Sequence, residues 1–325
     1  MGAPVKRLVG VVAALVALTL PAAWAGQAPD PSITERAPRL SGVLLFHHYT
    51  AYRNWDSQLM MLDLATGRLA TISKNWKVIH AMNGHFSPDG NSIVFMGSKA
   101  GLKDWDIFIT HFDGQRWVEP MNLTGPNDKR DEDPKFSPDG TSIVYKTDGA
   151  IKVMKSDGTL IAQYTSGDPE ASMPYFLPDN SGILYESNHS IMLHTATSER
   201  KIWGGLDKSA YYPIALSPTE FLFTETQKSR VDRVLHGYLD GRSTPLFFDS
   251  PVWDSSDPYP YQDGTRYLFY VSTDRVTGFG GYDLVFADLK LKKVWNLWTL
   301  NHKINTGEEQ LGPCWSATTH YPSAV

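Results

Sequence analysis

The sequence has little of three things that define common protein classes. It has one cysteine, Cys314, which excludes an internal disulfide framework. Its formal net charge is −5, which argues against nucleic acid as a partner because phosphate binding needs a basic face. Beyond its first residues it has no apolar stretch approaching ~18 residues, so we expect no membrane span.

The first residues have the pattern of a removable export signal. Lys6 and Arg7 precede an apolar run from Leu8 to Leu20, and residues 23–25 (Ala-Trp-Ala) form a small-x-small cleavage site. The apolar run, about 13 residues long, is too short to cross a bilayer. We therefore expect a signal peptide at 1–25, cleaved near Ala25, an N-terminal extension at 26–42 and one domain at 43–325. The predicted product is a secreted or periplasmic monomer.

An internal repeat is the strongest signal in the chain. Residues 86–90 read Phe-Ser-Pro-Asp-Gly, the same five residues recur at 136–140, and weaker copies start at Phe176, Leu216 and Tyr261. Proline and glycine at these positions favour a type I turn. A short β-rich run follows each turn, at 92–95, 142–145, 182–185, 221–223 and 267–270. Short strands recurring every 40–50 residues indicate propeller blades.

The number of blades follows from the anchor residue of each first strand. These anchors are Phe86, Phe136, Phe176, Leu216, Pro260 and Trp315. Too few residues follow Trp315 for another blade, and the segments 43–46 and 58–63 lack a first strand before them. We therefore predict an all-β, six-bladed β-propeller of four-stranded blades, in which the C-terminal strand completes the N-terminal blade.

The repeat also resembles a known family. The Phe-Ser-Pro-Asp-Gly turn with its following Ile-Val-Phe strand, and the stretches at 272–283 and 305–309, are similar to the TolB-like, WD-like Asp-rich repeat β-propellers. That family includes polysaccharide lyases, peptidase-associated propellers and envelope binding proteins. The resemblance implies the fold and leaves the function open between these classes.

Aligning the blades on their anchors predicts which side chains surround one mouth of the channel. The loops that lead into first strands bring Asp131–Asp133, Glu170, Tyr212 and Asp257 there, together with His80, His85, Arg130 and Tyr211. The ends of second strands bring His47, His48, Lys146, Glu186 and Glu225. The candidate catalytic residues are His48, His80, His85 and Tyr211, and the candidate substrate-binding residues are Arg130, Lys146, His47, Tyr49, Glu186 and Glu225. For His85 a packed, hydrogen-bonded side chain is an equal interpretation. For Arg130 the alternative is a structural ion-pair cluster with the acidic run Asp131–Asp133.

Two functions fit this mouth. The first is a lyase that cleaves an acidic oligo- or polysaccharide by β-elimination: Arg130 and Lys146 neutralise a uronate, a histidine takes the proton, and Tyr211 or Tyr49 donates one. In a hydrolase variant Glu186 and Glu225 are acid and base. The alternative is a non-catalytic, TolB-like periplasmic platform that binds a peptide or an envelope protein. A divalent cation, Ca²⁺ or Mn²⁺, is a further candidate at the mouth.

Overall fold

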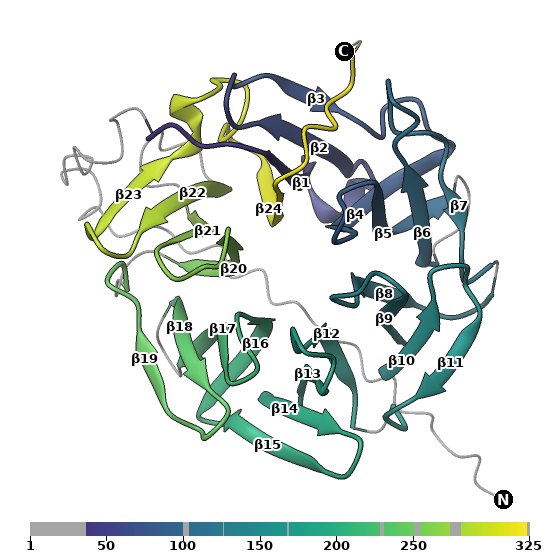
Figure 1. The fold of residues 1–325 in the computed structure, drawn as a ribbon, viewed down its shortest axis with the longest axis vertical. Coiled ribbons are helices and arrows are strands. Elements are labelled where there is room, and N and C mark those ends of the chain that lie inside the picture. The colour runs from purple at the N-terminus through teal and green to yellow at the C-terminus, as the bar shows by residue number, and fades with distance from the viewer. Residues whose placement is uncertain are drawn as a thin grey trace, which may run out of the picture.

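The chain forms a closed ring of six antiparallel sheets, each of four strands (Figure 1). This computed structural model describes residues 37–99, 104–125, 127–167, 169–227, 231–249, 254–273 and 281–323. The ring confirms the predicted six-bladed β-propeller. The predicted signal peptide and residues 26–36 of the extension lie outside the described residues. No helix in the described ranges is long and apolar enough to cross a membrane.

The blades follow one another along the chain, and each starts next to the central axis. Blade 1 contains β24 (Glu309–Ser316), β1 (Val43–Tyr49), β2 (Gln58–Asp63) and β3 (Leu69–Thr71). Blade 2 contains β4 (Val78–Phe86), β5 (Ser92–Lys99), β6 (Asp106–His111) and β7 (Met121–Asn122). Blade 3 contains β8 (Asp131–Phe136), β9 (Ser142–Thr147), β10 (Ala150–Lys155) and β11 (Leu160–Gln163).

The other three blades have the same order. Blade 4 contains β12 (Ala171–Phe176), β13 (Gly182–Ser187), β14 (Ser190–Thr195) and β15 (Glu199–Gly204). Blade 5 contains β16 (Lys208–Ala215), β17 (Glu220–Gln227), β18 (Asp232–Tyr238) and β19 (Ser243–Pro245). Blade 6 contains β20 (Ser255–Tyr261), β21 (Tyr267–Thr273), β22 (Tyr282–Asp288) and β23 (Lys293–Asn296). Short 3-10 helices η2 (Tyr52–Asn54) and η3 (Leu297–Thr299) lie in connections.

Blade 1 is made from both ends of the chain, as predicted. β24 pairs antiparallel with β1, with Leu45 opposite Cys314 and Leu44 opposite Trp315. Figure 1 shows the yellow β24 on the inner side of the purple β1. The ring is therefore closed by backbone hydrogen bonds between the two ends of the chain.

The repeated turns fold alike because their aspartates bond locally. Asp89 Oδ1 accepts hydrogen bonds from the Asn91 amide at 3.0 Å and from Ser87 Oγ at 2.5 Å. Asp139 accepts the equivalent bonds from Thr141 and Ser137 at 3.0 and 2.6 Å. The Ser-Pro-Asp-Gly motif is therefore a structural turn in blades 2 and 3.

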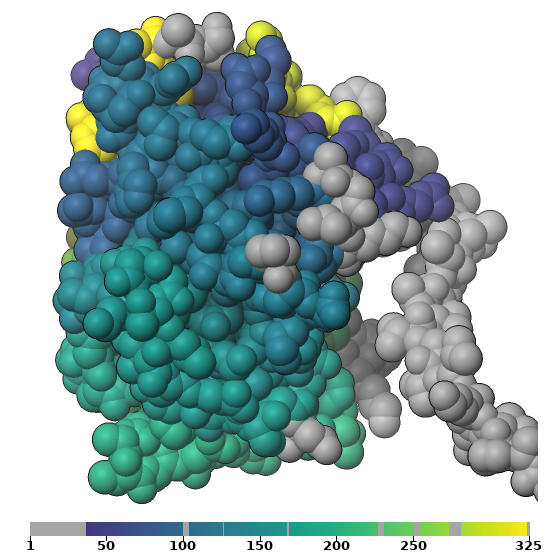
Figure 2. All heavy atoms as spheres, turned by 90° about the vertical axis from the view of Figure 1, so that its right-hand side faces the viewer, coloured from purple at the N-terminus to yellow at the C-terminus, as the bar shows by residue number. Residues whose placement is uncertain are grey.

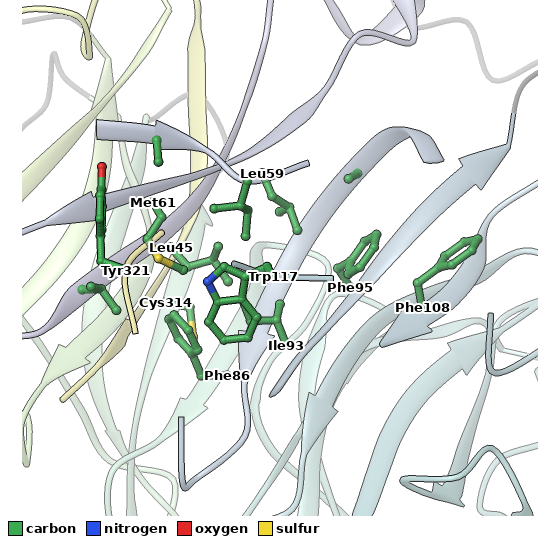
Figure 3. Packing of buried hydrophobic residues seen from close by; sticks show 14 of the residues in the cluster. Leu45, Leu59, Met61, Phe86, Ile93, Phe95, Phe108, Trp117, Cys314 and Tyr321 are labelled. Atoms are coloured by element: carbon green, nitrogen blue, oxygen red, sulfur yellow. The ribbon is translucent and has the colours of Figure 1, made fainter. Parts of the chain in front are cut away.

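Apolar side chains fill the spaces between neighbouring blades. Between blades 1 and 2, Leu45, Phe86, Trp117 and Cys314 belong to one buried cluster (Figure 3). Seen from the side, successive blades stack into one continuous wall (Figure 2). The polar side chains considered below therefore project from a well-packed scaffold.

A bulge interrupts every innermost strand at the same place, next to the axis. In five blades the bulge residue has a positive φ of 46–55°, and in blade 1 it is a glycine at 61°. These six residues are Asn83, Asp133, Met173, Tyr212, Asp257 and Gly312. Bulges often redirect side chains at functional sites. Here they form a ring around the axis, and we call it the bulge ring.

Candidate binding site at the channel mouth

A cavity of about 420 Å³ lies on the bulge ring, and we call it the mouth cavity. It is lined by His47, Tyr49, Tyr52, Met82, Asn83, Met96, Arg130, Glu132, Asp133, Lys146, Glu170, Ser172, Met173, Tyr212, Asp257 and Leu311. A narrower channel of about 60 Å³ shares five of the six bulge-ring residues with it and also reaches His85 and Lys135. Residues from all six blades thus meet at one polar and aromatic opening.

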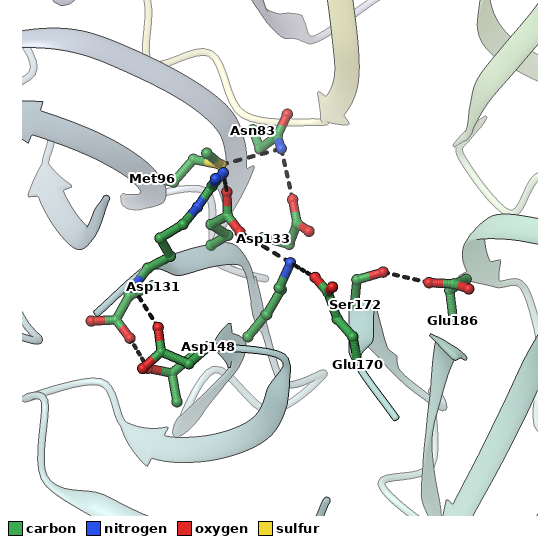
Figure 4. A network of polar contacts seen from close by, with 12 residues as sticks. Asn83, Met96, Asp131, Asp133, Asp148, Glu170, Ser172 and Glu186 are labelled. Atoms are coloured by element: carbon green, nitrogen blue, oxygen red, sulfur yellow. Dashed lines mark hydrogen bonds and ion pairs between the residues drawn. The ribbon is translucent and has the colours of Figure 1, made fainter. Parts of the chain in front are cut away.

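Both cations of the mouth cavity are held by carboxylates (Figure 4). Lys146 Nζ lies 3.1 Å from Glu132 and 2.5 Å from Glu170. Arg130 Nη2 donates to the same Glu132 at 2.5 Å. Arg130 therefore forms a structural ion pair with Glu132, which belongs to the acidic run Asp131–Asp133. The charges of these two cations are already balanced within the protein.

The buried histidines of this region share one hydrogen-bonding pattern. Nδ1 of each accepts from a backbone N–H: Ser57 to His80 at 3.0 Å, Phe136 to His85 at 3.3 Å and Asn83 to His47 at 3.4 Å. Burial lowers the pKa of His47 to about 3 and that of His80 to about 4. Burial also holds the pKa of His85 well below its usual value. All three are therefore neutral at pH 7, with the proton on Nε2.

Four of the sequence-predicted residues meet in the mouth cavity, namely Arg130, Lys146, His47 and Tyr49. His85 lies deeper, beside the rings of Tyr175 and Tyr259. His80 is fully buried and packs on Trp55 and Trp105, with ring centroids 4.9 and 4.6 Å away. His80 therefore does not line the mouth cavity, whereas Arg130 does.

The other predicted residues do not line the mouth cavity. His48 Nε2 lies 2.9 Å from Glu308, and the Tyr211 hydroxyl lies 2.5 Å from Thr226 Oγ1. Glu186 accepts from Ser172 at 2.7 Å (Figure 4), and the fully buried Glu225 pairs with Arg233. Each of these side chains has a structural partner in the fold.

Asp257 and Lys135 were given no role from the sequence, yet they lie at the axis. Asp257 accepts from the Gly312 amide at 3.3 Å and from Ser256 Oγ at 3.4 Å, both long bonds. Burial raises the pKa of Asp257 to about 6. The sequence does contain a sign of this position at the axis. Asp133 and Asp257 each stand directly before a proline, and that proline lies two residues before the anchor of its blade. Lys135 follows the proline in blade 3.

The residues at the mouth do not fit a divalent cation. In the described part of the chain no group of three or more His, Cys, Asp or Glu side chains is arranged to hold a metal ion. Nδ1 of His47 already accepts a backbone hydrogen bond, and Glu132 is engaged by Arg130 and Lys146. We therefore derive no chemical step through a metal.

Comparisons with known proteins support the fold. No protein-family profile and no curated protein sequence matches the chain. TolB from Acinetobacter baumannii matches with a TM-score of 0.65 at 15% identity, over 86% of this chain and 68% of that one. Hydrazine synthase from Kuenenia stuttgartiensis matches with a TM-score of 0.63 at 12% identity, over 87% and 47%. Oligogalacturonate lyase from Vibrio parahaemolyticus matches with a TM-score of 0.51 at 14% identity, over 80% of each chain.

Identities this low carry the fold and no specific function. The neighbours include both kinds of protein that the sequence resemblance named, a TolB and a polysaccharide lyase. By its six four-stranded blades and these likenesses, the chain has the fold of the TolB-like β-propellers.

Proposed function

We propose that this protein is a non-catalytic binding platform of the bacterial envelope, which receives a segment of a partner polypeptide in the mouth cavity. The observation that carries the proposal is the set of ion pairs around Lys146 and Arg130. An acidic sugar would have to displace Glu132 or Glu170 to reach either cation. The cavity presents four carboxylates against two cations, so it repels anions.

The lining suits a peptide. Tyr49, Tyr52 and Tyr212 offer flat aromatic surfaces, while Met82, Met96 and Met173 offer adaptable apolar contacts. Ser172 and Asn83 add polar groups that can bond to a backbone. Such a mixture of aromatic, methionine and polar side chains is typical of protein recognition surfaces. The export signal expected at 1–25 and the TolB-like fold support an envelope location.

The lyase is the second candidate, because Arg130, Lys146 and Tyr49 do share one cavity. A lyase needs an available base, and the histidine among the described lining residues, His47, is 2% exposed with its pKa lowered by burial to about 3. Incubation with a panel of uronate polysaccharides tests this function directly. Appearance of an unsaturated, ultraviolet-absorbing product would establish the lyase and overturn the platform.

Blocking the mouth cavity should abolish peptide binding. Leu311 lines the cavity, so Leu311→Trp should fill part of it, whereas Leu291 is 58% exposed in the turn between β22 and β23. Linear peptides selected from a random phage library on the mature protein should lose at least about ten-fold in affinity on Leu311→Trp. They should keep their affinity on the matched variant Leu291→Trp.

Isothermal titration of the selected peptides measures this difference, with melting curves to show that both variants fold. A failure to select any peptide, or equal affinities for both variants, would contradict a platform that uses this mouth.

A further inference from the structure

The charges near the axis do not balance. Arg130 and Lys146 pair with Glu132 and Glu170, which leaves Asp133, Asp257 and the deeper Lys135. Two carboxylates thus face one ammonium in the channel. An excess of negative charge at a partly buried site favours a ligand that carries a positive charge.

Asp257 is the least satisfied of these carboxylates. Its hydrogen bonds measure 3.3 and 3.4 Å, whereas Asp133 accepts from Asn83 Nδ2 at 2.7 Å (Figure 4). Strong bonds to a carboxylate are about 2.7–2.9 Å long. Among the described residues no arginine or lysine lies within ion-pair distance of Asp257, and Lys135 attracts its carboxylate only from further away. The oxygens of Asp257 can therefore accept from a ligand.

A buried donor at the same cavity is an independent second observation. His47 lines the mouth cavity and is 2% exposed. Its Nδ1 accepts from the Asn83 amide, and its Nε2 has no hydrogen-bond partner among the described residues. A buried donor of this kind costs free energy unless a ligand or a water molecule supplies an acceptor.

We propose that the mouth cavity binds a primary ammonium group of the partner polypeptide, with Asp257 and Asp133 as its acceptors and with His47 Nε2–H donating to an adjacent carbonyl oxygen. This inference rests on the proposed peptide platform and names the group that the platform recognises. The aromatic faces of Tyr49 and Tyr212 in the same cavity add cation–π attraction. The ammonium belongs either to an amino terminus or to a lysine side chain.

Small probes test the charge requirement. Tyrosinamide carries an ammonium beside a carbonyl, and N-acetyltyrosinamide is the same molecule without the positive charge. At about pH 7 the ammonium of an amino-terminal group is mostly protonated. Titration calorimetry should show tyrosinamide binding about ten-fold or more tightly than its acetylated form. Nα-acetyl-lysine amide, whose only ammonium is on the side chain, is tested alongside. Its binding distinguishes a lysine side chain from an amino terminus as the source of the ammonium.

Asp257→Asn should remove the preference for the charged probe. The matched variant Asp240→Asn changes an exposed carboxylate in the turn between β18 and β19, and the asparagine can still accept from the Arg242 amide there. This control should keep the preference. If tyrosinamide and N-acetyltyrosinamide bind equally to the wild type, or if Asp257→Asn retains the difference, the ammonium site is wrong.

A pH series on the wild-type protein keeps the test decisive should Asp257→Asn fail to fold. The charged and titratable groups around Asp257 are Asp133 and Lys135 on β8, Tyr212 on β16, Tyr49 on β1 and Tyr282 on β22. Nearby carboxylates and burial raise the pKa values of the tyrosines, so they stay neutral below pH 7. Burial raises the pKa of Asp257 to about 6, so acid neutralises it while the probe stays charged.

Affinity for tyrosinamide should therefore fall about ten-fold between about pH 7 and about pH 5, and binding of the acetylated probe should not change. A flat profile for tyrosinamide would overturn the ammonium site. The platform has its own test. If peptides lose affinity on Leu311→Trp but the probes show no preference for positive charge, the ammonium inference is refuted and the platform is retained.

Discussion

A chain ended after Gly307 should show no cooperative thermal unfolding. Such a chain lacks β24, the innermost strand of blade 1, and so exposes the hydrogen-bonding edge of β1. The truncation also removes the buried side chains of Cys314 and Gln310. The expected loss is the whole stability of the domain, commonly about 5–15 kcal/mol, followed by aggregation through the open strand edge.

The matched control is a chain ended after Ser323, which keeps every described residue. Calorimetry and size-exclusion chromatography should give a wild-type melting curve and a monomer-sized peak for this control. The truncation after Gly307 keeps Asn305, whose side chain bonds to Leu284 and Asn296, so the effect reports on β24 and not on that contact. A cooperative transition near the wild-type temperature would show that ring closure is dispensable.

The fold was predictable from the sequence because its determinants are local and repeat. Proline and glycine at 88 and 90, and again at 138 and 140, specify the same turn in two blades. The spacing of the anchors then gives the number of blades. Closure was predictable because residues 43–46 have the pattern of a second strand, and the innermost strand beside β1 is indeed the C-terminal β24.

The site was predictable only in part because its charges come from different blades. Alignment on the anchors correctly brought Arg130, Lys146 and Tyr49 to one cavity. It could not show that Lys146 on β9 reaches Glu170, 24 positions further along and just before β12. Nor could it show how deeply His80 is buried, since its burial depends on Trp105 and Trp55 from other segments.

The bulges in the innermost strands are a second reason why the site was only partly predictable. Strict alternation along an innermost strand assigns side chains to the wrong face once a residue with positive φ is inserted. Asp133 and Asp257 are such residues: the sequence brought both to this mouth, where they lie, but it gave neither a role there. The proline after each of them is the local sign of that geometry.

Arg233→Met should destabilise the protein by about 3–5 kcal/mol, because it takes away a cation that pairs with buried Glu225. Glu225 on β17 is fully buried and lies directly opposite Arg233 on β18. Arg233 also donates to Asp249 at 2.9 Å, so its guanidinium bridges two carboxylates. Urea unfolding monitored by tryptophan fluorescence measures the free energy of unfolding.

Two further variants show whether the loss comes from the buried charge. Arg242→Met removes an ion pair in which the side chains are 73% and 53% exposed, and it should leave the free energy of unfolding nearly unchanged. The double variant Arg233→Met with Glu225→Leu should recover most of the stability lost, because apolar side chains of similar volume replace a buried pair well. If Arg233→Met costs as little as Arg242→Met, Glu225 is not held by this pair. It would then remain a candidate for the substrate contact that the sequence suggested.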